Sequence, residues 1–429
     1  MIMVVLLGLL IAFSLVGIPL AISIGASCIS FILAETPKLI LMFPQRIWSG
    51  SFSYVMVAMP LFIFMGELMN ESGLTSRLID FCMYLVRPIR GGLGEVNIVA
   101  SMIFGGISDS SVADTSCLGS VLIPEMEKKG YPPEVAAGIT VASSTMGMVI
   151  PPSIPMIMFS MITSASVGAL FMAGLVPGVL VGVFQLVVCY IISKKKGYHP
   201  KLEKLDVKKM TSTLLYSLPA VIMPIIMVCS ISFGITTASE AGAVAVAYSL
   251  VLGFFVYKKL TIKAVIKALC KTMLSTASIL IIIAFSTIFT WLLTMKQVPQ
   301  TVAAMFMSLD MPRWTMLLIL DLLILFLGTF IDVSPAILML TPILLPIMRA
   351  LGVSDWQFGG IFIIGLAIGL VTPPVGMCLN VCNKINGMPI IKIAKGALPY
   401  VICNIIVLLL ITFIPELTTA VPLLMGYKM

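Results

Sequence analysis

The sequence of 429 residues contains little charge. Only 10% of its residues are Asp, Glu, Lys or Arg, against roughly 25% in an ordinary soluble domain, while 60% are hydrophobic. A soluble core cannot absorb this excess of apolar side chains. Apolar runs of about 20 residues recur along the chain, and each is long enough to cross a hydrocarbon layer about 30 Å thick as a helix. Because a helix satisfies its own backbone hydrogen bonds in lipid, we expect an all-α polytopic membrane protein.

The sequence also lacks the residues on which many enzyme sites depend. It contains one histidine, His199, in a charged loop, and neither a Walker A sequence nor a serine nucleophile elbow. Its nine cysteines are scattered through apolar segments without a CxxC pair, as expected of small apolar residues in a core. We therefore predict that the protein is not an enzyme.

Positive charge is in excess, with a formal net charge of +8, but the lysines lie in short loops between apolar runs. This placement indicates membrane topology and not nucleic-acid binding, because cytoplasmic loops are enriched in Lys and Arg. Loop 194–209 carries seven lysines and loop 258–271 carries five, so both are predicted to be cytoplasmic. The second is expected to form a basic amphipathic helix on the cytoplasmic surface of the membrane.

Nine apolar spans are predicted, near residues 2–33, 51–70, 134–163, 167–193, 212–233, 237–257, 273–295, 355–384 and 396–415. The first is too long for the apolar part of a signal peptide and is expected to be retained, with Gly17, Pro19 and Gly25 as places where it bends or divides.

Two further blocks, 94–129 and 313–351, are interrupted near their middle by polar residues, as in a helical hairpin that enters and leaves on one side. Counting passes from the cytoplasmic loops places Arg77, Arg87 and Arg90 inside and Arg313 outside. The two re-entrant hairpins are therefore expected to open from opposite faces of the membrane.

An internal repeat relates the two blocks. A shift of 222 residues aligns 104–180 with 326–402 without gaps, and nine of the sixteen identities are Gly or Pro. These two residues restrict the backbone, so their matches do not follow from apolar composition alone. With opposite entry sides, the duplication predicts inverted-topology repeats, an architecture of many secondary transporters.

The predicted parts are scaffold helices and an amphipathic arm (1–93), a first transport repeat (94–180), scaffold helices and basic loops (181–312), a second, inverted transport repeat (313–402) and a C-terminal end (403–429).

Each repeat contains two polar breaks. The hairpin tips lie at 105–114 and 328–335, and the following spans are broken at 143–153 and 369–376, where the pairs Pro151-Pro152 and Pro373-Pro374 remove backbone donors. The carbonyls of Ile150 and Thr372 are expected to lack helical partners. Carbonyls, hydroxyls and a carboxylate form the all-oxygen environment that hard cations prefer, so we predict sodium sites in two broken helices near the membrane centre.

The alternative for these breaks is that each proline pair only kinks a packed helix. Two matched breaks, each preceded by a polar hairpin tip, favour binding sites instead. Asp109, Asp114 and Asp332 are costly to bury in a membrane, so each is a functional candidate, although a position at a wet edge would also accommodate it.

At this level of detail the sequence resembles the large membrane subunit of tripartite ATP-independent periplasmic (TRAP) transporters. The likeness rests on segment 105–160, with GGISDSSVAD and VIPPS, on segment 328–376, with IDVSPAILMLTPILLPIM and LVTPPVG, and on TTASEAGA at 236–243. Asp109 departs from the family pattern, in which a small residue is more usual. The resemblance implies a sodium-driven elevator, in which hairpins and broken helices move against a scaffold.

The resemblance also implies partners and site residues. The partners are a small membrane subunit of about four helices, a periplasmic substrate-binding protein that delivers an organic acid such as sialic acid or a C4-dicarboxylate, and the lipids of a bacterial inner membrane. The coupling ion is Na⁺ at two sites or more. The implied sodium ligands are Ser108, Ser110, Gly147, Ile150 and Pro151 in the first site, and Gly328, Asp332, Gly369, Thr372 and Met377 in the second. The implied substrate contacts are Ser143, Ser144, Thr145, Asp332 and Ser334.

Two other functions stay open at this stage. A stand-alone sodium/dicarboxylate symporter of related elevator fold would need no partners. An intramembrane enzyme is a second alternative, against which the lack of a paired catalytic Asp or His argues.

Overall fold

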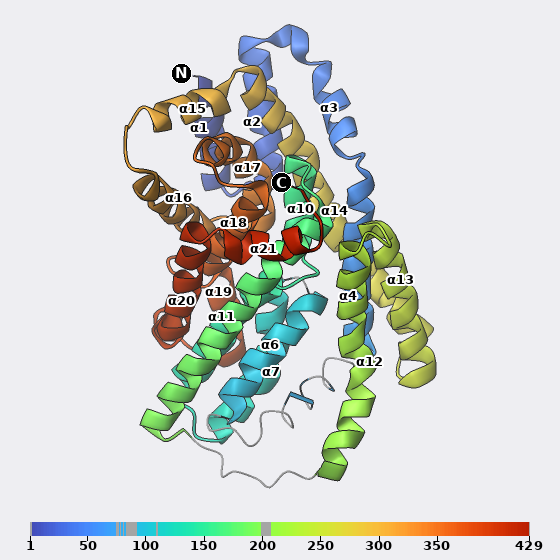
Figure 1. The fold of residues 1–429 in the computed structure, drawn as a ribbon. Coiled ribbons are helices and arrows are strands. Elements are labelled where there is room, and N and C mark those ends of the chain that lie inside the picture. The colour runs from blue at the N-terminus through green and yellow to red at the C-terminus, as the bar shows by residue number, and fades with distance from the viewer. Residues whose placement is uncertain are drawn as a thin grey trace.

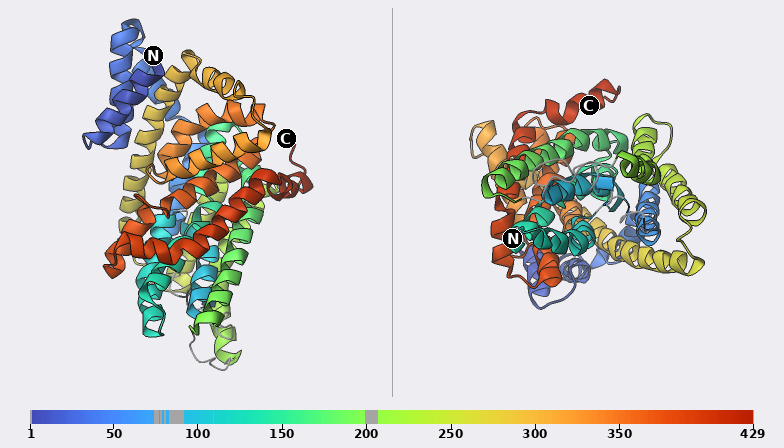
Figure 2. Two further views of the ribbon diagram at one scale, coloured as in Figure 1. Left: turned by 90° about the vertical axis from the view of Figure 1, so that its left-hand side faces the viewer. Right: turned by 90° about the horizontal axis from the view of Figure 1, so that it is seen from below.

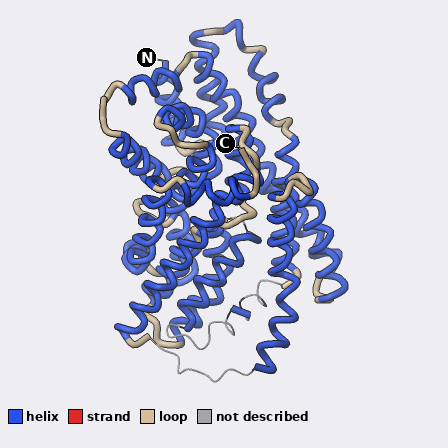
Figure 3. The backbone as a smooth tube through the Cα atoms, viewed as in Figure 1, coloured by secondary structure: helices blue, strands red, loops and turns tan. Residues whose placement is uncertain are grey.

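The computed structural model describes residues 2–73, 77, 79, 81, 82, 92–108, 110–198 and 207–428. In this part of the chain the regular structure is helical throughout, joined by short loops (Figure 3), which confirms the all-α prediction. Asp109, His199, Arg87 and Arg90 lie outside the described residues.

The described α-helices are α1 (Ile2–Leu15), α2 (Leu20–Glu35), α3 (Met42–Gly50), α4 (Ala58–Glu71), α6 (Gly92–Ser108), α7 (Ser111–Lys128), α8 (Pro133–Ser143), α9 (Met146–Val149), α10 (Ile154–Thr163), α11 (Val167–Lys196), α12 (Val207–Ser232), α13 (Ala238–Val251), α14 (Ile262–Met295), α15 (Val298–Met307), α16 (Arg313–Gly328), α17 (Val333–Ala350), α18 (Asp355–Leu370), α19 (Met377–Asn386), α20 (Ile390–Phe413) and α21 (Glu416–Leu424) (Figure 1).

Several of these helices have the length and composition of membrane spans. Five described helices qualify alone, and two bent helix pairs bring the number to seven. The long spans predicted near 167–193, 237–257, 273–295 and 396–415 correspond to α11, to α13 with its continuation to Val256, to α14 and to α20. The chain is therefore a polytopic membrane protein.

The expected N-terminal span 2–33 is two helices. The helix stops at Leu15 and restarts at Leu20, because Gly17 adopts a φ of +90° and Pro19 has no backbone donor for a continuing helix. Gly25 stays helical, with Phe285 of α14 so close that a Cβ on Gly25 would lie 2.7 Å from its ring.

The basic segment at 258–271 is helical from Ile262 onward, as predicted, but it is not a separate surface helix. These residues form the first part of α14, a continuous helix of 34 residues. Its lysines contact α4, where Lys267 pairs with Glu71 at 3.0 Å and Lys271 pairs with Glu67 at 3.2 Å. A run of residues without Gly or Pro lets the helix continue into the span that follows.

The two hairpins lie toward opposite ends of the molecule. The pair α6 and α7 occupies the lower part of Figure 1, whereas α16 and α17 lie in the upper part, and Figure 2 shows the same separation. The arms α6 and α7 pack along each other. In the second hairpin α16 lies mainly along α18, and α17 lies along α10 and α15.

The centre of the molecule is built around α18, in which every residue from Trp356 to Leu370 is buried. Helix α8 crosses α20 so closely that a Cβ on either Gly138 or Gly396 would collide with the opposite backbone. Both glycines belong to the identities of the internal repeat. The boundaries predicted at 180/181 and 402/403 fall inside α11 and α20, which run on as continuous helices.

Candidate functional site

The first helix break follows α9. Residues Ile150–Ser153 are not helical, and the chain bends by 42° before it continues as α10. Because Pro151 and Pro152 carry no N–H, the Gly147 and Met148 carbonyls of α9 lose their usual donors. The Ser153 hydroxyl replaces one of them by donating to the Met148 carbonyl at 2.6 Å, and it also accepts from the Met156 amide at the start of α10. Among the described residues, no backbone amide donates to the Ile150 carbonyl.

The second break has the same construction. Helix α18 ends at Leu370, residues Val371–Gly376 are not helical, and α19 begins at Met377. The Thr372 hydroxyl donates to the Ile368 carbonyl at 2.7 Å, while no described backbone amide donates to the carbonyl of Thr372. The Pro151-Pro152 and Pro373-Pro374 peptide bonds are both cis. The broken segments of the two repeats therefore share backbone geometry as well as sequence.

Each hairpin meets its break through glycine. In the first repeat a Cβ on Gly105 would lie 2.8 Å from the Gly147 Cα, and one on Gly106 would lie 3.1 Å from the Pro151 carbonyl oxygen. In the second, a Cβ on Gly328 would lie 3.3 Å from the Gly369 Cα. Only glycine permits backbones to approach this closely. Backbone oxygens of the hairpin end and of the broken helix are thus brought to one place in each repeat.

Asp114 lies at the junction of the first hairpin and break. Its side chain is completely buried, and its Oδ1 accepts a hydrogen bond from the Ser108 hydroxyl. Its Oδ2 lies against Gly147, so closely that a Cβ there would collide with it. This oxygen is buried and has no hydrogen-bond partner among the described residues. Ser108 and Gly147, two of the predicted sodium ligands, are therefore linked through a carboxylate.

The hairpin tips are capped by their own side chains. Ser110 accepts from the Ala113 amide at 3.3 Å at the start of α7, and Asp332 accepts from the Val333 amide at 2.8 Å at the start of α17. Both are only partly buried. Asp332 and Ser110 occupy equivalent positions in the repeat, so the second hairpin carries a charge where the first carries a hydroxyl.

The start of α19 lies beside the first hairpin. Helix α19 packs along α7, and Cys378 in its first turn is completely buried. Met377, a predicted ligand of the second site, is the residue directly before it. A predicted ligand of the second site therefore begins a helix that packs on the hairpin of the first.

The three consecutive hydroxyls predicted to contact substrate each connect the broken helix to another helix. Ser143 lies 2.8 Å from the Ser101 hydroxyl, Ser144 accepts from Thr115 at 2.9 Å, and Thr145 accepts from Asn404 at 3.0 Å. All three are buried. In this structure their hydroxyls hold the first break in place, while Ser334, the other predicted contact, lies half-buried in the first turn of α17.

Sequence reasoning missed a buried amide pair beside the first break. Gln185 of α11 donates to Asn404 of α20 at 2.7 Å and to the Ala142 carbonyl at 3.1 Å. Both side chains are almost completely buried. Each is the side-chain amide of a residue in an apolar span. Such a residue could have been singled out from the sequence, because a buried amide in a membrane protein needs a hydrogen-bond partner within the protein.

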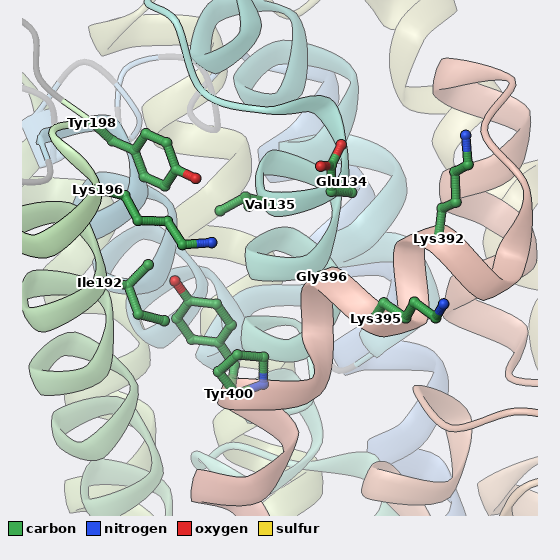
Figure 4. A pocket seen from close by; sticks show the side chains of 10 residues that line it. Glu134, Val135, Ile192, Lys196, Tyr198, Lys392, Lys395, Gly396 and Tyr400 are labelled. Atoms are coloured by element: carbon green, nitrogen blue, oxygen red, sulfur yellow. The ribbon is translucent and has the colours of Figure 1, made fainter.

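A basic pocket of about 460 Å³ opens between α8, α11 and α20 (Figure 4). It is lined by Lys196, Lys392 and Lys395, with Glu134 among them. None of its lining residues belongs to either hairpin tip or helix break, so it is separate from the predicted ion sites.

Comparison with known proteins agrees with this geometry. The family described as "Tripartite ATP-independent periplasmic transporter, DctM component" matches residues 7–417. The chain is 36% identical to the sialic acid TRAP transporter large permease protein SiaM of Vibrio cholerae, over 98% of both chains. It is 34% identical to the C4-dicarboxylate TRAP transporter large permease protein DctM of Pseudomonas aeruginosa, over 94% of both.

Among solved structures, the YdaH transporter of Alcanivorax borkumensis has a similar fold, with a TM-score of 0.63 at 16% identity over 88% of each chain. The relatives are named as permeases, which agrees with the prediction that this chain is not an enzyme. The resemblance found in the sequence is thereby confirmed: the chain belongs to the DctM family of large membrane permease subunits of TRAP transporters.

Proposed function

We propose that this permease imports an organic acid into the cell by an elevator mechanism driven by sodium. The observation that carries the proposal is the matched pair of hairpin–break junctions, Gly105 against Gly147 and Gly328 against Gly369. Both junctions gather backbone oxygens that have lost helical donors. Na⁺ is a hard cation that prefers such oxygen ligands, and two equivalent sites suit a coupled ion.

The first proposed sodium site uses Ser108, Ser110, Gly147, Ile150 and Pro151, and the second uses Gly328, Asp332, Gly369, Thr372 and Met377. Contact between the tip and the break in each half supports both assignments. The organic acid would bind between the two sites, near the start of α19, where α7 and the first break also meet.

The moving part would comprise the two hairpins and the two broken helices. The scaffold would include α14 together with α2, α3 and α4, each of which packs on α14. Packing of α14 on α17 places the two parts side by side, where one can slide against the other. Re-entrant hairpins that open from opposite membrane faces fit the placement of α6–α7 and α16–α17 at opposite ends of the molecule.

The family is tripartite and periplasmic by description, so we propose a bacterial inner-membrane location and two partners. One is the small membrane subunit, and the other is a periplasmic protein that delivers the substrate. Relatives named for sialic acid and for C4-dicarboxylates point to an organic acid as cargo.

The test is uptake into proteoliposomes that contain this chain with its small subunit. Radiolabelled N-acetylneuraminate and succinate are supplied in turn with the matching binding protein and an inward Na⁺ gradient, and K⁺ replaces Na⁺ in the control. We expect uptake of one acid that requires both the Na⁺ gradient and the binding protein. Equal uptake in K⁺ contradicts sodium coupling. Full uptake by this chain alone supports the stand-alone symporter instead.

A further inference from the structure

The two hairpin tips are similar in backbone but differ in charge. Ser110 and Asp332 are equivalent N-cap residues, and Asp114 and Ala336 are equivalent residues one turn later. The first-turn hydrogen bonds correspond: the Asp114 amide donates to the Ser110 carbonyl at 2.9 Å, and the Ala336 amide to the Asp332 carbonyl at 3.1 Å. A carboxylate therefore lies at the start of the second arm in both hairpins, and the two positions are four residues apart in the aligned sequences.

The Asp114 carboxylate has an environment that suits a bound cation. It is completely buried, and no lysine or arginine forms an ion pair with it within the described parts of the chain. One oxygen accepts from Ser108, while the other is unpartnered and lies against Gly147. A buried charge of this kind is costly unless an opposite charge neutralises it.

Two further features of the junction favour a cation. Pro151 has no amide to donate to the carbonyl of Gly147, the residue that lies against the unpartnered oxygen. Helix α6 ends at Ser108, which donates to Asp114, and the C-terminal end of a helix carries partial negative charge. A buried carboxylate, a carbonyl without its helical donor and a helix C-terminus thus lie at one junction.

We infer that the Asp114 carboxylate supplies the negative charge of the first cation site, as Asp332 does in the second. In the aligned repeats, Asp114 lies one helical turn further along its helix than Asp332. This inference rests on the proposed sodium coupling and deepens it. Two sites of similar backbone geometry would then hold their neutralising charges at different depths. The carboxylate of the first site is buried and shielded by Ser108, whereas that of the second lies at a partly exposed helix start.

The chain offers a matched control in Asp321 of α16. It is also buried, one of its oxygens has no hydrogen-bond partner among the described residues, and the other accepts from Thr412 at 3.0 Å. Because this bond joins α16 to α20 and not to the first break, Asp321→Asn removes a buried charge without touching the first site.

The experiment measures uptake as a function of external Na⁺ in proteoliposomes that contain the complex with its small subunit and binding protein. For Asp114→Asn we expect the half-saturating Na⁺ concentration to rise at least tenfold and the Hill coefficient to fall toward one. Na⁺-dependent thermal stabilisation of the purified membrane complex, with choline as reference, should shrink in parallel. Asp321→Asn should leave both sodium readouts as in the wild type.

If the dependence of uptake on Na⁺ concentration is unchanged in Asp114→Asn, the inference is overturned, because the site then does not need the charge of the carboxylate. An equal shift in Asp321→Asn also overturns it, since the effect would follow from any lost buried charge. Sodium-independent uptake by the wild type would instead overturn the proposed function itself. If Asp114→Asn does not assemble, Asp114→Ser removes the charge with a smaller side chain; a tenfold rise in half-saturating Na⁺ supports the inference, and an unchanged value overturns it.

Discussion

Gly328, the last residue of α16, lies directly against Gly369, the penultimate residue of α18. A Cβ on Gly328 would lie 3.3 Å from the Gly369 Cα and 3.0 Å from the Leu366 carbonyl oxygen. This contact joins the second hairpin to the second break. It requires both residues to lack a side chain, since the opposing atoms belong to the backbone and cannot rotate away.

Gly369→Ala is expected to separate the hairpin from the break. A methyl group at this position collides with the Gly328 backbone, and overpacking of this kind costs about 1–3 kcal/mol of unfolding free energy. We expect a lower melting temperature and at least tenfold slower uptake. Gly8→Ala is the control, because a Cβ there meets nothing within 4 Å. Equal behaviour of the two variants would show that the close contact is dispensable.

The buried Gln185–Asn404 pair is expected to act as a unit. Asn404→Leu removes the 2.7 Å bond to Gln185 and the 3.0 Å bond to Thr145, so that each of these buried side chains loses one of its two partners. The loss should be about 1–3 kcal/mol, measured by denaturant titration of the purified protein. The double variant Gln185→Leu, Asn404→Leu should lose less than the sum of the single losses, because no orphaned amide remains. Strict additivity would show that the two side chains are independent.

The ion pairs between α14 and α4 are predicted to contribute little. Lys267–Glu71 and Lys271–Glu67 are partly exposed, so solvent screening limits each to about 0–1 kcal/mol. Glu71→Lys should lower the melting temperature slightly, and the added Lys267→Glu exchange should restore it. The difference in melting temperature between the wild type and Glu71→Lys should shrink as the salt concentration is raised. A large loss in Glu71→Lys that salt does not alter would indicate a role in packing.

The inverted arrangement predicts opposite exposure of Lys129, after α7, and Arg313, at the start of α16. Both are exposed in the structure. With the exposed Cys229 and Cys270 replaced by serine, Arg313→Cys should react with a membrane-impermeant maleimide in intact spheroplasts. Lys129→Cys should react only after permeabilisation. Labelling of both from the same side would contradict inverted repeats.

The broken helices illustrate what a sequence can predict well. Paired prolines in the middle of an apolar run determine locally that a helix cannot continue, and the structure breaks at both places. The Gly and Pro identities between the repeats were predictive for the same reason, since these residues limit backbone conformation wherever they occur. Helix ends were harder. The basic segment belongs to α14 from Ile262 onward, and its packing on α4, a helix far away in the sequence, does not show in the local pattern.

Polar residues in the apolar spans show the opposite case. Ser143, Ser144 and Thr145 were predicted to contact substrate, but their partners Ser101, Thr115 and Asn404 come from three other helices. Asn404 and Gln185 were overlooked, although each interrupts an apolar run. Local pattern shows that such a group must find a partner in a membrane protein, but not which partner it finds.

Composition and the positions of glycine and proline by themselves determined the membrane helices, the duplication and the two breaks, because apolarity and backbone restriction act within a few residues. Tertiary structure alone decided which hydroxyl donates to which acceptor, and it left one oxygen of Asp114 against Gly147 without a hydrogen-bond partner in the described parts of the chain. The reason is that pairing of buried polar groups depends on distances between helices that are remote in sequence, and close glycine contacts set those distances.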